Sequence, residues 1–93
     1  MKAIGIVSKI FPDDLTGNRH QKFTVLLKNH KTVLVIHNID IGGRIDNLHI
    51  GDKIEVLGEY QWNTSGGIIH WTHKDPHGRH NDGWIRHKGR LYQ

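Results

Sequence analysis

Apolar and polar residues alternate with a period of two along most of this chain, the pattern of half-buried β-strands. The clearest case spans residues 53–62, where four apolar or aromatic side chains share one face: Ile54, Val56, Tyr60 and Trp62. Such a face packs inward in a half-buried strand. We therefore expect Tyr60 and Trp62 in the core.

The same alternation predicts four more strands, at residues 4–10, 22–28, 32–37 and 68–73. Asn29-His30 makes a short turn between the second and third strands, and the glycine-containing segment 63–67 makes a tight loop between the fourth and fifth. Two hairpins are therefore expected.

Residues 38–48 are too short and too glycine-interrupted for a long helix, but they are long enough for one helical turn across a barrel end. Five strands with such a connector between the third and fourth are typical of the OB-fold, a mostly β barrel. A chain this short holds one core. We expect a single domain over residues 1–93, with the barrel in 1–74 and an irregular, packed tail in 75–93.

Composition narrows the class of protein. The chain has no cysteine, so disulfides and thiolate metal ligands are excluded and any metal needs His, Asp or Glu. There is no run of about 18 apolar residues to cross a membrane, and the first residues lack the apolar core of a signal peptide. The chain as written is expected to be soluble and cytoplasmic, with no membrane partner.

The charge distribution favours an anionic partner. Lys and Arg outnumber Asp and Glu by 13 to 9, and nine histidines add positive charge as the pH falls. Residues 74–93 carry five basic and two acidic side chains, so most of the excess lies in the tail. A phosphate-bearing ligand fits this distribution, and so does a solvated basic tail.

The densest group of chemically active residues is the segment 70–80, HWTHKDPHGRH. On a regular strand His70 and His73 point to opposite faces, so they share an ion only if the strand ends between them. A turn at Asp75 brings His77 or His80 back beside His73 and Asp75, a mixed ligand set suited to Zn or Mn. The alternative is a hydrogen-bonded network that fixes the tail to the barrel.

A second polar group is expected at the same barrel rim. Arg19 and His20 enter the second strand, while His37 and Asp40 follow the third, so the four converge with the segment 73–75 if the fifth strand ends on that side. An Arg there holds phosphate through a bidentate contact, and a His such as His20 transfers a proton near neutral pH. An inter-loop hydrogen-bond network is the alternative.

Three smaller signals remain open. Asp13-Asp14 is either a carboxylate pair for metal-assisted phosphodiester chemistry or ordinary loop sequence. Trp71 and Trp84 are candidates for a partly exposed stacking platform, as in barrels that bind nucleic acid. Arg86, close to Trp84 in the chain, is a candidate charge partner for phosphate.

The chain resembles an uncharacterised family of small bacterial and phage proteins, a domain of unknown function with the signature HWTH-x-DP-x-GRH followed by GW. Here the signature falls on residues 70–80 and 83–84. The similarity extends to Arg19-His20-Gln21, to the segment 37–40 and to Tyr92-Gln93. The resemblance implies no activity, although its signature covers the polar residues selected on chemical grounds, and it implies relatives with an additional N-terminal segment for export.

Three functions follow from these observations. The first is an OB-like module that binds nucleic acid or another phosphate-bearing ligand, through the candidate ligand-binding residues Arg19, His37, Asp40, Trp71, Arg79, Trp84 and Arg86. The second is a metal-assisted phosphodiesterase or nuclease, with catalytic candidates His73, Asp75 and His20 and metal-ligand candidates His73, Asp75 and His80. The third is a phage or host protein-interaction or inhibitor module.

Overall fold

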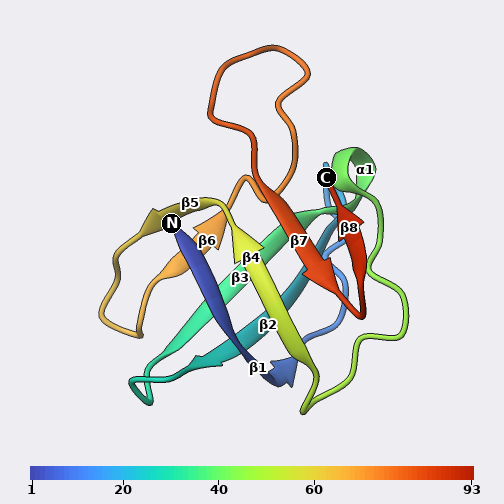
Figure 1. The fold of residues 1–93 in the computed structure, drawn as a ribbon. Coiled ribbons are helices and arrows are strands. Elements are labelled where there is room, and N and C mark those ends of the chain that lie inside the picture. The colour runs from blue at the N-terminus through green and yellow to red at the C-terminus, as the bar shows by residue number, and fades with distance from the viewer.

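The computed structural model describes residues 1–93 and is mostly β, with eight strands in a single sheet and one helix of four residues (Figure 1). The elements are β1 (Lys2–Ile10), β2 (His20–Leu27), β3 (Thr32–Asn38), α1 (Ile39–Gly42), β4 (Lys53–Leu57), β5 (Glu59–Gln61), β6 (Ile68–His70), β7 (Trp84–His87) and β8 (Arg90–Tyr92). No helix in the structure has the length and apolar character needed to cross a membrane.

The strand order in the sheet is β5-β6-β3-β2-β1-β4-β7-β8. All neighbours pair antiparallel except β3 and β6, which pair in parallel through Leu34 opposite Ile68 and Val35 opposite Ile69. The mostly β class is thus confirmed. The five-stranded barrel is not, because the sheet has eight strands and is not closed.

The core is one cluster of twelve buried apolar residues drawn from most of the strands and the connector. They are Ala3, Val7, Phe23, Val25, Val33, Val35, Ile45, Ile54, Val56, Ile69, Ile85 and Tyr92. Ile45 ties the connector to β2, since the buried Gln21 amide accepts from its main-chain N–H at 2.9 Å and donates to its carbonyl at 3.2 Å. This pair of hydrogen bonds leaves no buried polar group unpaired at that point.

Glycine 58 divides the predicted strand 53–62 into β4 and β5. A Cβ on Gly58 would lie 2.5 Å from the carbonyl oxygen of His70, so only glycine permits this close approach. Beyond the break β5 is an edge strand, paired only with β6. The expectation of a core position for Tyr60 and Trp62 is wrong: their side chains are exposed, that of Trp62 to 72 %.

The last predicted strand ends at His70 instead of His73, because Trp71 turns the chain with φ of 54°. The segment from Trp71 to Gly83 then projects from one end of the sheet as the orange loop of Figure 1. After it, β7 pairs with β4 and β8 with β7, so the tail adds two strands to the sheet. The chain reversal at Trp71 positions the pocket described next.

Candidate anion-binding pocket

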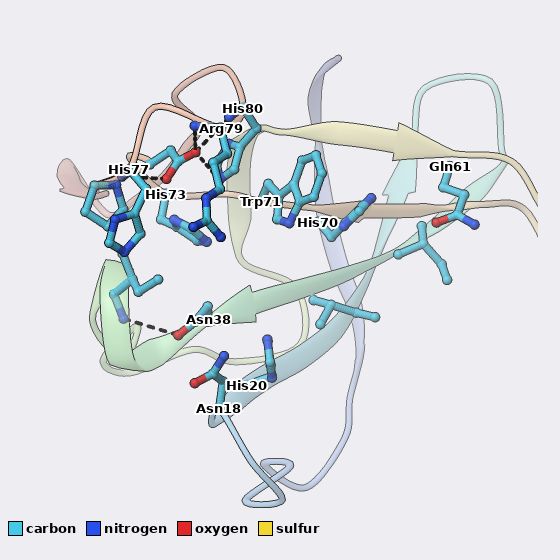
Figure 2. A pocket seen from close by; sticks show the side chains of 15 residues that line it. Asn18, His20, Asn38, Gln61, His70, Trp71, His73, His77, Arg79 and His80 are labelled. Carbon is cyan, nitrogen blue, oxygen red and sulfur yellow. Dashed lines mark hydrogen bonds and ion pairs between the residues drawn. The ribbon is translucent and has the colours of Figure 1, made fainter.

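A pocket of about 540 Å³ opens between the start of β2, the end of β3, the end of β6 and the loop that follows β6 (Figure 2). Its lining is made of Asn18, His20, Ile36, Asn38, Ile41, Gln61, Ile68, His70, Trp71, His73, Asp75, Pro76, His77, Arg79 and His80. Register places His20 opposite Asn38, so β2 and β3 together form one wall. Five of the nine histidines therefore face one space.

Asp75 organises the loop on the other wall. Its Oδ1 accepts the main-chain N–H of His77 at 2.8 Å, and its Oδ2 accepts those of Arg79 and of His80, the latter at 2.7 Å. Burial alone would raise the pKa of Asp75, but these three N–H donors outweigh it and hold the pKa below its ordinary value. The carboxylate of Asp75 is thus committed to the loop backbone.

Aromatic rings stack along the same wall. The Trp71 indole lies parallel to the His80 imidazole, with ring centroids 4.6 Å apart and an interplanar angle of 10°. His70 tilts against Trp71 with centroids 4.8 Å apart, and Figure 2 shows Trp71 between the two imidazoles. Trp71 is 43 % exposed, but imidazoles flank it, so it is less open as a stacking platform than its sequence position suggests.

His73 is the most buried imidazole of the pocket, with 5 % of its surface exposed. Its Nδ1 lies 2.7 Å from the carbonyl oxygen of Lys74. Because a carbonyl only accepts, Nδ1 carries the proton in the neutral ring and Nε2 keeps its lone pair. Nε2 has no hydrogen-bond partner in the protein. Because no fully buried side-chain nitrogen is unpaired, Nε2 is accessible to solvent, on a residue that lines the pocket.

His80 has the same tautomer for the same reason. Its Nδ1 donates to the carbonyl of Asn81 at 2.7 Å, while its Nε2 lies 3.9 Å from Oδ2 of Asp75. The rings of His73 and His80 meet edge to face, with centroids 5.2 Å apart. The two imidazoles are therefore held by main-chain carbonyls in fixed orientations.

His37, near the end of β3, is completely buried. Its Nε2 donates to the carbonyl of Gly43 at 2.8 Å, and its Nδ1 lies 2.7 Å from the Thr72 hydroxyl, which donates to it. Burial is the main cause that lowers the pKa of His37 from 6.5 to about 4. His37 was expected to bind ligand; it does not line the pocket, and it joins the end of β3 to the chain beyond β6 as a neutral ring.

His20 reaches the pocket from β2, the wall opposite His73 (Figure 2). Its main chain is fixed by two hydrogen bonds of 2.9 Å with Asp14, an isolated bridge ahead of the strand. Its imidazole forms no hydrogen bond within the protein. The ring is thus positioned by the backbone and free to meet a ligand.

Arg19 and Asp40 bind each other. The guanidinium of Arg19 contacts Oδ1 of Asp40 through Nε at 2.8 Å and through its terminal nitrogen at 2.7 Å, and its main-chain N–H donates to Oδ2 at 2.8 Å. These main-chain and side-chain contacts of Arg19 lower the pKa of Asp40. Both residues are exposed beside the pocket without lining it, so their charges compensate each other.

Arg79 is the one Lys or Arg among the pocket residues. Its main chain bonds to Asp75, and its guanidinium forms no ion pair within the protein. Trp84 and Arg86 lie on β7, away from the pocket, where the Arg86 guanidinium carbon is 5.4 Å from the centre of the Trp84 ring. The fixed positive charge at the pocket therefore comes from Arg79.

Residues 1–93 match the family described as "Protein of unknown function (DUF3465)". The chain belongs to the DUF3465 family. No curated protein and no solved structure matches it. The expected membership of an uncharacterised family is confirmed, and the DUF3465 description assigns no activity to the pocket.

The pocket of this DUF3465 chain contains no group of three or more side chains arranged to hold a metal ion. Of the expected ligands, Asp75 accepts three main-chain N–H groups, and the Nδ1 atoms of His73 and His80 are bonded to carbonyls. The Asp13-Asp14 pair also separates, with Asp13 on Arg44 and Asp14 on Lys22. The geometry gives no support to a metal centre.

Several lining residues were not singled out from the sequence. Gln61 reaches the pocket because β5 pairs with β6, which places it opposite Ile68. Asn18 and Asn38 flank His20, and Asn38 also caps α1 by accepting the N–H groups of Asp40 and Ile41. Of these three residues, only Asn38 has a pattern that can be recognised in the sequence, that of a helix cap. The positions of Gln61 and Asn18 in the pocket depend on tertiary pairing.

Proposed function

We propose that this chain binds single-stranded nucleic acid, holding phosphate in the pocket between β2, β3 and the loop after β6. The observation that carries the proposal is the charge balance of the lining: five imidazoles and the unpaired guanidinium of Arg79 surround one carboxylate, Asp75. That carboxylate already accepts three N–H groups. The guanidinium of Arg79 forms charge-assisted hydrogen bonds to phosphate oxygens, and the imidazoles of His20, His70 and His77, whose rings form no hydrogen bond within the protein, offer N–H donors.

An exposed aromatic side chain in the pocket lining favours an extended ligand over a free phosphate ion. Trp71 lines the pocket and is 43 % exposed, with one side of its ring stacked on His80. Bases stack on such rings with little sequence preference. A strand whose phosphate occupies the pocket would place a neighbouring base within reach of the exposed part of Trp71.

The strand pairing supports an OB-like arrangement, which we include in the proposal. The parallel β3–β6 pair and the antiparallel β1–β4 and β5–β6 pairs are those of an OB barrel if β4 and β5 act as one strand bent at Gly58. OB barrels bind oligonucleotides on one face. Slow amide exchange in both the β1–β4 and the β5–β6 ladders would agree with this, and rapid exchange throughout β5–β6 would contradict it.

The binding proposal is tested by fluorescence anisotropy with a labelled oligothymidylate of about ten nucleotides, at several salt concentrations. Arg79→Gln should weaken binding by a factor of about 10 to 100, because a charge-assisted bond contributes about 1.5–3 kcal/mol. It should also reduce the slope of log K against log salt by about 0.7, one phosphate contact on a single strand.

Arg86→Gln is the matched control, since it removes the same charge from β7, outside the pocket. We expect it to change affinity less than twofold. Equal losses in the two variants would mean that net charge alone attracts the ligand, and no binding by the wild-type chain would overturn the proposal.

A further inference from the structure

We propose that the same pocket cleaves RNA without a metal ion, with His73 as general base and His20 as general acid. The inference rests on the proposed function, because RNA must first bind in the pocket. It goes beyond that function by assigning a reaction and two catalytic residues.

The geometry of His73 fits a general base. The bond of 2.7 Å from its Nδ1 to the Lys74 carbonyl leaves Nε2 as the basic nitrogen. His73 is only 5 % exposed, its ring orientation is held by that bond and by the edge contact with His80, and Nε2 has no partner in the protein. A base fixed in this way loses no rotational freedom when substrate binds.

His20 provides the second proton-transfer group from the opposite wall. Its main chain is locked to Asp14, and its ring has no partner in the protein. The carboxylates of Asp14 and Asp40 interact electrostatically with the ring, and each carboxylate is paired with a cation, Lys22 and Arg19 respectively. In the proposed step the protonated ring is the form that gives up its proton.

The reaction is a transesterification in which atoms and electrons balance. Nε2 of His73 takes the proton of the ribose 2′-hydroxyl as the 2′-oxygen forms a bond to phosphorus. The bond from phosphorus to the 5′-oxygen breaks, and His20 gives its proton to that oxygen. The products are a 2′,3′-cyclic phosphate and a 5′-hydroxyl, and no oxidant, reductant or metal is consumed.

Arg79 supplies the remaining requirement, stabilisation of the charge that develops on the non-bridging phosphate oxygens. Its guanidinium is unpaired in the protein and lines the same pocket. Metal ions serve this purpose in many nucleases. In the proposed reaction the guanidinium of Arg79 takes that place.

The test uses the full chain with a chelator present. A labelled RNA oligonucleotide measures cleavage, and a 2′-O-methyl RNA of the same sequence, which has no 2′-hydroxyl to attack, measures binding. We expect cleavage of the first only, with products that end in a 2′,3′-cyclic phosphate identified by mass spectrometry.

His73→Gln and His20→Gln should each reduce the cleavage rate at saturating RNA by a factor of about 100 or more while 2′-O-methyl RNA still binds. His30→Asn is the control: His30 is an exposed turn residue with φ of 65°, which Asn tolerates. All proteins are purified identically, so that a contaminating ribonuclease would appear equally in every variant. Because His73 is buried, the less buried His20 gives an independent variant if His73→Gln fails to fold.

The outcomes separate the two proposals. Binding of 2′-O-methyl RNA without cleavage of RNA overturns the catalytic inference and leaves the binding function intact. Cleavage that persists in His20→Gln, or that is equal in all variants, also overturns it. No binding to either oligonucleotide overturns both proposals.

Discussion

The buried imidazole of His37 should make the free energy of unfolding depend on pH below neutrality. Both ring nitrogens are hydrogen-bonded in the neutral state, to the Gly43 carbonyl and the Thr72 hydroxyl. A proton added to this ring would be desolvated and would face the imidazoles of His73 and His20, which further disfavour the charge. The folded chain therefore resists protonation that the unfolded chain accepts.

The magnitude follows from the two pKa values of His37, about 4 in the folded state and 6.5 in the unfolded state. Between these values the unfolded chain binds more protons, so its stability relative to the folded chain increases as the pH falls. The loss is about 1.4 kcal/mol per pH unit, which amounts to about 2 kcal/mol at pH 5. Below pH 4 both states are protonated and the loss levels off.

Urea unfolding of the wild type and of His37→Gln at pH 7, 6 and 5 measures this contribution. Gln offers a donor and an acceptor without titrating, so it should destabilise the protein at pH 7 and lose most of that disadvantage at pH 5. The difference between the two proteins should shrink by about 2 kcal/mol. His30→Asn, at an exposed turn, should keep the wild-type pH dependence. A wild-type-to-His37→Gln difference that stays constant from pH 7 to pH 5 would refute the reasoning.

Two further predictions concern the loop and the strand break. Asp75→Asn should speed amide exchange in residues 77–80, because the carboxylate accepts main-chain N–H groups there. In the wild type the same loosening should begin only below the ordinary carboxyl pKa of 3.8, because the pKa of Asp75 is lowered in the folded state. Unchanged amide exchange in Asp75→Asn would contradict this. Gly58→Ala should lower the free energy of unfolding in urea by about 1–3 kcal/mol, since its Cβ would approach the His70 carbonyl to 2.5 Å, whereas Gly17→Ala meets no atom within 4 Å. Equal losses in the two glycine variants would exclude crowding as the cause.

The central strands were readable from the sequence because their alternation is regular. Residues 22–28 and 32–37 were predicted, and β2 and β3 lie at 20–27 and 32–38 with Phe23 and Val25 buried. The break at Gly58 was not readable, since it depends on the approach of the His70 carbonyl from β6. The short strands β7 and β8 are defined by tertiary pairing, β7 with β4 and β8 with β7, which no local pattern encodes.

The candidate site likewise combines features that the sequence predicts with features that only the tertiary structure determines. Residue types alone marked the polar segment 70–80 as a candidate site. The pocket is lined by its side chains His70, His73, Asp75, His77, Arg79 and His80. Sequence does not reveal which charges are already used. Arg19 pairs with Asp40, Asp75 is taken by the loop backbone and His37 is buried, and each outcome depends on distances set by the tertiary structure.

The most direct test of the proposed function is the long-range ¹H–¹⁵N spectrum of the histidine side chains during titration with an oligothymidylate. The account predicts that the imidazole nitrogens of His20, His73 and His80 shift with a common affinity, while those of the exposed His30 and His49, outside this pocket, stay in place. Shifts confined to His30 and His49, or equal shifts in all the histidines, would contradict phosphate binding in the pocket.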